Sequence, residues 1–224
     1  NANIMKCFEL CRTDWLYIIG DDDVLLDNSI NIMLEDIKNN KNNYCINYKW
    51  LPEEKWSVKR PILTIGIDSF ISKIEGISQV LFIAANLYNV SYLKKYLSFG
   101  NNYQLSNAPH LITLLIGLNN NDNAKVLLSN KTIVRNGYDD VDVPLKTKWS
   151  PSIIFQDIRL LLDIPIKSKS KTFLYNKITQ SFKIENLLNS LLNDYHVTKD
   201  KRALHENFVK ATSYSSIYEK KVNG

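Results

Sequence analysis

Five consecutive apolar residues, Trp15–Ile19, are followed by Gly20 and then by three adjacent aspartates, Asp21–Asp23. A continuous apolar run rich in aromatic and β-branched residues predicts a buried strand of a parallel sheet, because such strands are covered on both faces. Ligands of α/β proteins bind beyond the carboxyl ends of the strands. The run therefore predicts an α/β fold with a functional site at the three aspartates.

Helical and strand patterns alternate through the first 135 residues. Apolar residues three and four apart predict helices, and short β-branched runs predict strands. The predicted helices are Asn3–Cys11, a helix capped by Asp27 whose apolar face is Ile30, Met33, Leu34 and Ile37, Ser69–Glu75, Ser91–Leu97 and Pro109–Leu118. The predicted strands besides Trp15–Ile19 are Tyr44–Trp50, Leu81–Leu87, Lys125–Leu128 and Thr132–Arg135. This alternation predicts an α/β domain.

The pattern changes after Trp149. The amphipathic helices predicted there run from Ser150 to Leu162, from Thr172 to Tyr195 and from Lys201 to Tyr218. We therefore expect a domain at residues 1–148 and a helical tail at residues 149–224, a division that suits a chain of 224 residues. The lysine-rich start of the tail is typical of a helix that rests on an anionic membrane surface or, alternatively, of a packed helix with a solvated face.

Composition and short motifs exclude several classes of protein. The 28 Lys and Arg residues leave a net charge of +5 against 23 Asp and Glu, an excess too small to indicate nucleic-acid binding. No apolar run reaches the roughly 18–20 residues that a membrane span requires. The three cysteines form no Cys-x-x-Cys pair, so a reducing cytosol is the expected compartment. The sequence contains no phosphate-binding glycine loop and no Gly-x-Ser-x-Gly elbow.

The three aspartates place like charges side by side, which destabilises a fold unless a positive charge lies among them. On an extended backbone Asp21 and Asp23 point the same way and Asp22 points the other way. A divalent cation, bound by one or two carboxylates and by phosphate oxygens, supplies the positive charge. The alternative is a solvated turn whose aspartates cap the next helix.

Residues 13–23, Thr-Asp-Trp-Leu-Tyr-Ile-Ile-Gly-Asp-Asp-Asp, resemble the acidic-motif region of family 2 glycosyltransferases of the GT-A fold. The resemblance is strongest to the abequosyltransferase-like branch, in which Gly-Asp-Asp-Asp is common, and it extends over residues 1–135. It implies a partial GT-A (Rossmann-like) mixed sheet with helices on both faces, followed here by a C-terminal helical appendage. It also implies an N-terminally truncated chain, because the βα units that hold the nucleoside precede the acidic motif in this fold and this chain begins at Asn1.

The resemblance implies a metal-dependent, inverting glycosyltransferase. Such an enzyme moves a sugar from a nucleotide-sugar donor to a bacterial surface glycan or lipid-linked acceptor, in the cytoplasm or at the inner face of the cell membrane. By the resemblance, Asp23 and Asp21 hold Mg²⁺ or Mn²⁺, and Asp21 and Asp22 face the nucleoside. Arg135 and Lys131 reach the diphosphate or, alternatively, are surface charges.

An inverting transfer needs a base that takes the proton of the acceptor hydroxyl. In the family this base is an acidic residue at the start of a later helix, but the corresponding segment, Ser106–Ile112, has no carboxylate. His110 is the nearest residue able to act as this catalytic base. In the first turn of a helix the positive end of the dipole disfavours the imidazolium form, so a neutral base is available there. A core histidine bonded to the backbone is the alternative.

Two other functions compete with sugar transfer. A truncated, non-catalytic glycosyltransferase-like domain that binds a partner through its tail would explain both the absent N-terminal units and the absent carboxylate. A phospho-accepting receiver domain also places aspartates at strand ends around Mg²⁺. It requires an acidic pair, a separate phospho-acceptor and a later lysine at different strand ends, whereas the three acids here are adjacent.

Overall fold

The structure, a computed structural model, describes residues 2–51, 59–104, 106–137, 159–181, 201–202, 205–206 and 209. Its contacts divide the chain into two compact units, Asn1–Val143 and Pro144–Gly224. The predicted boundary between residues 148 and 149 lies outside the described residues. In the second unit, residues 159–163 are helical and α9 spans Ser168–Ser181; most of the remaining predicted tail helices also lie outside the described residues.

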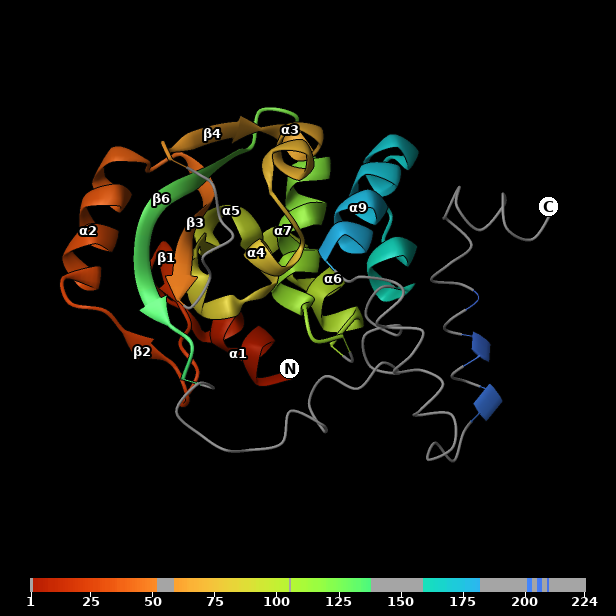
Figure 1. The fold of residues 1–224 in the computed structure, drawn as a ribbon, viewed down its shortest axis with the longest axis horizontal. Helices are drawn as coiled ribbons and strands as arrows, with labels where there is room; N and C mark the ends of the chain where they lie inside the picture. Colours follow the sequence, from red (N-terminus) through yellow and green to blue (C-terminus); the bar gives the residue numbers. More distant parts are fainter. Residues whose placement is uncertain are drawn as a thin grey trace. The chain divides into compact units, whose positions relative to one another are not determined.

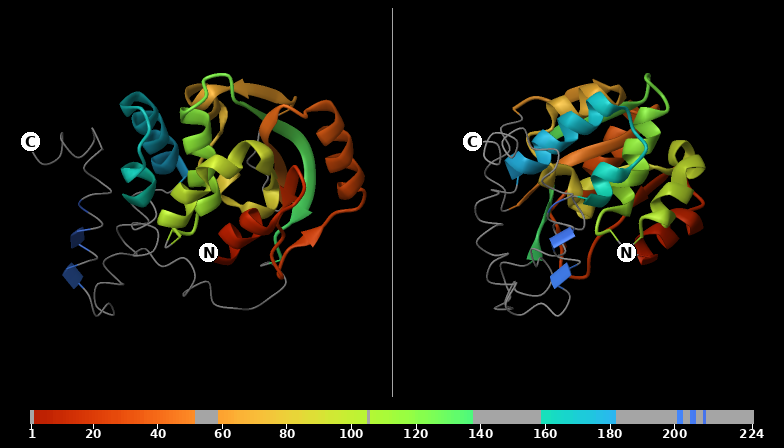
Figure 2. Two further views of the ribbon diagram at one scale, coloured as in Figure 1. Left: turned by 180° about the vertical axis from the view of Figure 1, so that it is seen from behind. Right: turned by 90° about the vertical axis from the view of Figure 1, so that its right-hand side faces the viewer.

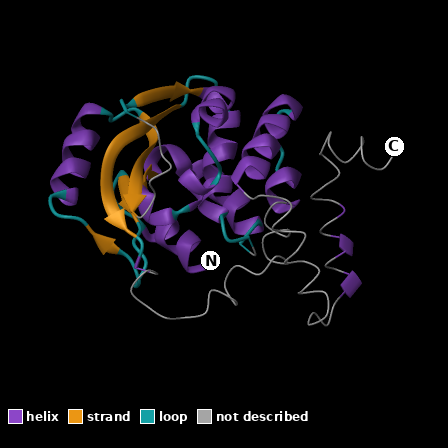
Figure 3. Cartoon of the chain, in the orientation of Figure 1, coloured by secondary structure: helices purple, strands orange, loops and turns teal. Residues whose placement is uncertain are grey.

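The described strands of the first unit form one curled, mixed sheet (Figure 3). They are β1 (Trp15–Tyr17), β2 (Val24–Leu25), β3 (Asn43–Leu51), β4 (Ile62–Ile65), β5 (Asn86–Asn89) and β6 (Lys125–Arg135). Their order is β1-β5-β3-β6-β2, and β4 pairs with the first part of β6. The pair β3–β6 is parallel and the other pairs are antiparallel. The mixed sheet predicted from the sequence is confirmed.

Helices lie on both faces of this sheet. They are α1 (Ala2–Leu10), α2 (Ser29–Asn39), α3 (Gly66–Lys73), α4 (Ser78–Leu81), the 3₁₀ turns η1 (Ile83–Ala85) and η2 (Lys94–Tyr96), α5 (Val90–Leu93), α6 (Leu97–Asn102) and α7 (Pro109–Asn119). In Figures 1 and 2, α2 lies on one face of the sheet, and α7 lies on the other with α1, α3, α5 and α6 packed against it. Among the described helices, none combines the length and the hydropathy that a bilayer crossing demands.

Helix α7 is the centre of the helical layer. Residues 109–118 are all buried, which follows from a segment that is apolar on every side. Pro109 stands in the first turn, as predicted, where its missing amide hydrogen costs nothing. The buried side chain of His110 belongs to this helix.

Strand β1 differs from the prediction. It covers three residues, is half-buried, and pairs only with β5 among the described strands, in antiparallel direction. Its run is apolar because Trp15 and Tyr17 pack against the α2 side of the core while Leu16 lies across from buried Tyr88 on the other face. An edge strand covered on both faces thus produces the same pattern as a central parallel strand.

Helix α2 also differs in detail. It begins at Ser29 behind Asn28, whose φ of 65° is left-handed, and not behind Asp27. Its buried face carries Met33 and Asp36, whereas Ile30 and Leu34 are exposed. The predicted apolar face was therefore partly wrong, because the buried face includes polar residues.

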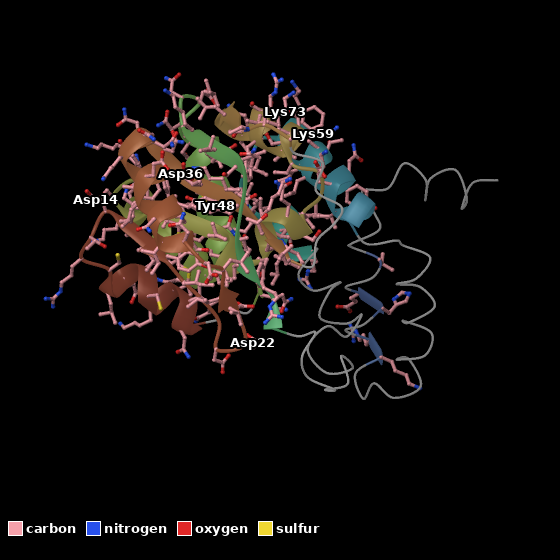
Figure 4. The ribbon with its side chains drawn as sticks, turned by 60° about the vertical axis from the view of Figure 1, so that its left-hand side comes forward. Asp14, Asp22, Asp36, Tyr48, Lys59 and Lys73 are labelled. Atoms are coloured by element: carbon pink, nitrogen blue, oxygen red, sulfur yellow. The ribbon has the colours of Figure 1, made fainter. Side chains whose placement is uncertain are left out.

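A part-buried ion pair fixes α2 to the sheet. Lys131 of β6 donates from Nζ to Oδ1 of Asp36 at 2.8 Å, and Asp36 is only 6% exposed. Burial raises the pKa of Tyr48 on β3, and the negative charge of Asp36 raises it further. Figure 4 labels Asp36 and Tyr48, which come from α2 and β3.

The predicted strand Leu81–Leu87 is instead the end of α4, the turn η1 and the start of β5. Buried amide side chains cause this bend. Asn86 donates from Nδ2 to the carbonyls of Phe82 (2.7 Å) and Val80 (3.1 Å) and accepts from Asn47 Nδ2 (2.9 Å). Gln79 donates to Asn47 Oδ1 at 3.1 Å. We call Asn47, Gln79 and Asn86 the amide network.

Replacing Asn86 with leucine is expected to lower the free energy of unfolding by about 3 kcal/mol, because two carbonyls and the Asn47 amide lose a partner inside the protein. Urea denaturation followed by circular dichroism measures this loss. The matched control is Asn89→Leu on the same strand, where one hydrogen bond to the Lys41 carbonyl (3.1 Å) is lost and about 1 kcal/mol is expected. Equal losses in the two variants would contradict a special role for the amide network.

Candidate functional site

The carboxyl ends of three strands meet at one edge of the sheet. β5 is antiparallel to both β1 and β3, so β1 runs in the same direction as β3. β6 is parallel to β3, and the arrowheads of both point the same way in Figure 1. The residues that follow β1 and β6 therefore lie at the same edge, which is where α/β proteins bind ligands.

The three aspartates lie in a turn at this edge and not on an extended strand. The amide of Asp23 donates to the carbonyl of Gly20 at 3.3 Å, and the amide of Gly20 donates to Oδ2 of Asp23 at 3.2 Å. These two bonds close the segment Gly20–Asp23, which we call the acidic turn. The predicted alternation, with Asp21 and Asp23 on one side, was wrong because a turn does not alternate its side chains as a strand does.

The acidic turn brings the carboxylates of Asp22 and Asp23 together. Oδ1 of Asp22 lies 2.7 Å, and Oδ2 of Asp23 lies 2.8 Å, from the point where a Cβ on Gly20 would stand. Both side chains are half-buried, whereas Asp21 is exposed. The structure thus pairs Asp22 with Asp23.

Two neighbouring carboxylates can provide part of a Mg²⁺ or Mn²⁺ shell. Such ions take one or two protein carboxylates and complete the shell with phosphate oxygens and water. Within the described ranges, no three His, Cys, Asp or Glu side chains gather as a complete metal site. The hard oxygen donors fit a site that a diphosphate completes.

Tyr17 links β1 to the turn η1. Its hydroxyl donates to the carbonyl of Ala84 at 2.8 Å. Burial raises the pKa of Tyr17, and the negative charge of Asp23 raises it further.

The two predicted cations separate in the structure. Arg135 is paired in register with Val24, the residue that follows the acidic turn, so it stands at the same edge. Lys131 binds Asp36 of α2, so it belongs to the ion pair that fixes α2 to the sheet. The position of Arg135 agrees with a role near a diphosphate, and Lys131 has a structural partner.

The chain after β6 passes directly against the acidic turn, a contact that sequence reasoning missed. The amide of Asn136 donates to the carbonyl of Leu51 at 2.8 Å and holds this segment on β3. At the next residue, Gly137, a Cβ would overlap the carbonyl oxygen of Asp22. A single glycine in a polar stretch has no periodicity, so no sequence pattern could have identified it.

His110 lies inside the helical layer. It is 1% exposed, its Nε2 is 3.1 Å from the carbonyl of Leu81, and its ring packs edge-on against Tyr88. Because a carbonyl only accepts, Nε2 carries the hydrogen and Nδ1 is bare; Nδ1 has no hydrogen-bond partner in the described part of the chain. Burial lowers the pKa of His110 to about 4, against a smaller opposing effect of the Leu81 carbonyl. This environment favours the core alternative, and the role of catalytic base stays a prediction.

Comparison with known proteins identifies the class of fold. The first unit, with its mixed sheet, helices on both faces and acidic turn, has a partial GT-A, Rossmann-like glycosyltransferase fold. The similarity is to the crystal structure of S. aureus TarS 1-349, with a TM-score of 0.51, 13% sequence identity and coverage of 92% of this chain. The chain spans 56% of the length of TarS 1-349.

Two further crystal structures of S. aureus TarS are less similar to this chain. TarS 1-349 in complex with UDP-GlcNAc gives a TM-score of 0.49 at 14% identity, with 91% of this chain and 57% of that chain covered. A further TarS structure gives 0.47 at 12% identity, with 92% and 40% covered. The sequence matches no protein-family model and no curated protein.

Proposed function

We propose that this chain forms the metal- and diphosphate-binding part of a glycosyltransferase whose donor is a nucleotide sugar. The observation that carries the proposal is the acidic turn, in which the carboxylates of Asp22 and Asp23 both lie against Gly20 at the carboxyl edge of the sheet. The glycosyltransferase-like fold supports the same function. The nucleoside, the acceptor and the place at the inner membrane face stay predictions from the sequence.

Each part of the site has a chemical role in this proposal. Asp22 and Asp23 hold the metal, while the sheet behind them fixes their positions. The metal, when bound, neutralises charge on the leaving diphosphate. Arg135, in register with Val24, places a guanidinium at the same edge, where such a group suits phosphate oxygens.

Isothermal titration calorimetry of the full chain tests the proposal. The probes are UDP and UDP-GlcNAc, the latter chosen because TarS 1-349 has been solved with it, and each is titrated with Mn²⁺ and again after EDTA. GDP and dTDP in the same series test the nucleoside. We expect metal-dependent binding of at least one nucleoside diphosphate. Absence of binding to Mn²⁺ and to every nucleotide would overturn the proposal.

A second candidate function is a nucleotide-binding domain that transfers no sugar. The observation that favours it is the start of α7, where a buried histidine stands in place of the carboxylate expected of a base. Release of UDP from UDP-GlcNAc separates the two candidates. Metal-dependent binding with release supports the enzyme, and the same binding without release, with and without glycan acceptors, supports the binding domain.

A further inference from the structure

Two glycines from separate parts of the chain lie at the acidic turn. Gly20 begins the turn, and Gly137 follows β6, the strand that lies between β2 and β3. Both lie at positions where a side chain would touch the turn itself. The two contacts are of different kinds, and each has its own consequence.

At Gly20 the missing side chain leaves room for the carboxylates. A Cβ there would stand 2.7 Å from Oδ1 of Asp22 and 2.8 Å from Oδ2 of Asp23. Carbon and oxygen atoms that are not bonded to each other stay more than 3 Å apart, so a methyl group on residue 20 would displace both carboxylate oxygens. The neighbours are flexible side-chain ends, so the backbone of the turn can stay in place.

At Gly137 the missing side chain leaves room for the backbone. A Cβ would overlap the carbonyl oxygen and approach the carbonyl carbon of Asp22, and neither atom can rotate away. The segment cannot retreat freely either, because the amide of Asn136 is bonded to Leu51 on β3 at 2.8 Å. A side chain at 137 therefore has to displace the acidic turn.

We infer that Gly20 and Gly137 are positioning residues that set where the Asp22 and Asp23 carboxylates stand for a metal-bound diphosphate. The inference rests on the proposed function for its ligand. Neither glycine touches the ligand in this account: Gly20 controls the spacing of the two carboxylates, and Gly137 controls the place of the turn at the sheet edge.

The test compares Gly137→Ala and Gly20→Ala with two control glycines, measured in the full chain. Gly117→Ala places a Cβ 3.2 Å from Leu93 and 3.3 Å from Tyr96 inside the helical layer. Gly100→Ala creates an overlap with Thr113 and Met5, so it costs stability away from the acidic turn. The readouts are calorimetric binding of UDP with Mn²⁺, the thermal midpoint, and the amide resonances of Gly20 and Asp23 in ¹H–¹⁵N spectra.

We expect Gly137→Ala and Gly20→Ala to weaken binding of UDP with Mn²⁺ about tenfold or more, since displaced supports of metal ligands cost that much. Gly100→Ala is expected to lower the thermal midpoint without this loss of affinity. Gly137→Ala should also move the Gly20 and Asp23 amide resonances, which Gly117→Ala leaves in place. If Gly137→Ala does not fold, Gly20→Ala still decides, because its new contacts are with side chains alone.

Failure of the inference differs from failure of the proposed function. If the wild-type chain binds UDP and the Gly137→Ala and Gly20→Ala variants bind it equally well, the inference is overturned and the proposed function stands. A wild-type chain that binds neither Mn²⁺ nor any nucleotide overturns the function. In that case unchanged amide resonances in Gly137→Ala overturn the inference as well, and shifted resonances support the control of the turn by Gly137.

Discussion

Replacing Asp23 with asparagine is expected to weaken the binding of UDP with Mn²⁺ about 100-fold, because removal of one charged partner costs on the order of 3 kcal/mol and each 1.4 kcal/mol or so is tenfold. Asparagine keeps an oxygen that can accept the bond from the Gly20 amide, so the turn is preserved while one negative charge is lost. Isothermal titration calorimetry measures the affinity. Thermal unfolding of the same sample confirms that the fold is intact.

Two further aspartates make this experiment specific. Asp27→Asn removes an exposed carboxylate between β2 and α2 and should leave the affinity unchanged. Asp21→Asn distinguishes two hypotheses about which carboxylates hold the metal. The structure favours Asp22 with Asp23, and the sequence predicted Asp21 with Asp23. A full loss in Asp21→Asn with none in Asp22→Asn would contradict the paired carboxylates that the structure shows.

Lowering the pH from 6.5 to 4 is expected to remove about 3 kcal/mol of folding free energy through His110 alone, since its pKa falls from 6.5 to about 4 on folding. Between pH 6.5 and about 4, His110 is protonated in the unfolded chain, whereas the buried imidazole of the folded chain stays neutral. The contribution is therefore complete above pH 6.5, falls with the pH, and is lost below about pH 4. Urea denaturation at a series of pH values measures it.

His110→Gln is the matched variant, because its amide nitrogen can take the place of Nε2 and donate to the Leu81 carbonyl without titrating. The carboxylates titrate in both proteins, so the difference between the two pH profiles isolates His110. Parallel profiles would show that the imidazole is not buried in neutral form. In the binding assay, His110→Gln should leave the affinity for UDP unchanged, and an intact rate of sugar transfer in this variant would exclude His110 as the base.

Local patterns predicted those parts of the fold that local interactions decide. α7 was predicted within one residue of its bounds, since its apolar residues follow a proline in the first turn. β3 also followed from a short apolar run, whereas the mixed sheet followed from the resemblance to the GT-A fold and not from the runs themselves. The segment before β5 was misread because the side chain of Asn86 binds carbonyls behind it, and a polar residue in an apolar run gives no sign of that bond.

The candidate site shows the same division. Three adjacent acids after an apolar run predicted the place of the acidic turn. Their geometry depends on a bond between Gly20 and Asp23, which makes a turn from a segment that has strand-like neighbours. The contact with Gly137 joins segments at opposite ends of the first unit, and one sequence holds no information on such a pairing.

The amide network consists of uncharged groups, and this has a consequence for solution measurements. Asn47, Gln79 and Asn86 gain and lose no protons in the accessible range, and added electrolyte does not screen their bonds. The amide network should thus keep its hydrogen bonds from dilute buffer to molar potassium chloride. Any change in ligand affinity over that range reports on charged groups, such as the carboxylates and cations at the sheet edge, and not on the amide network.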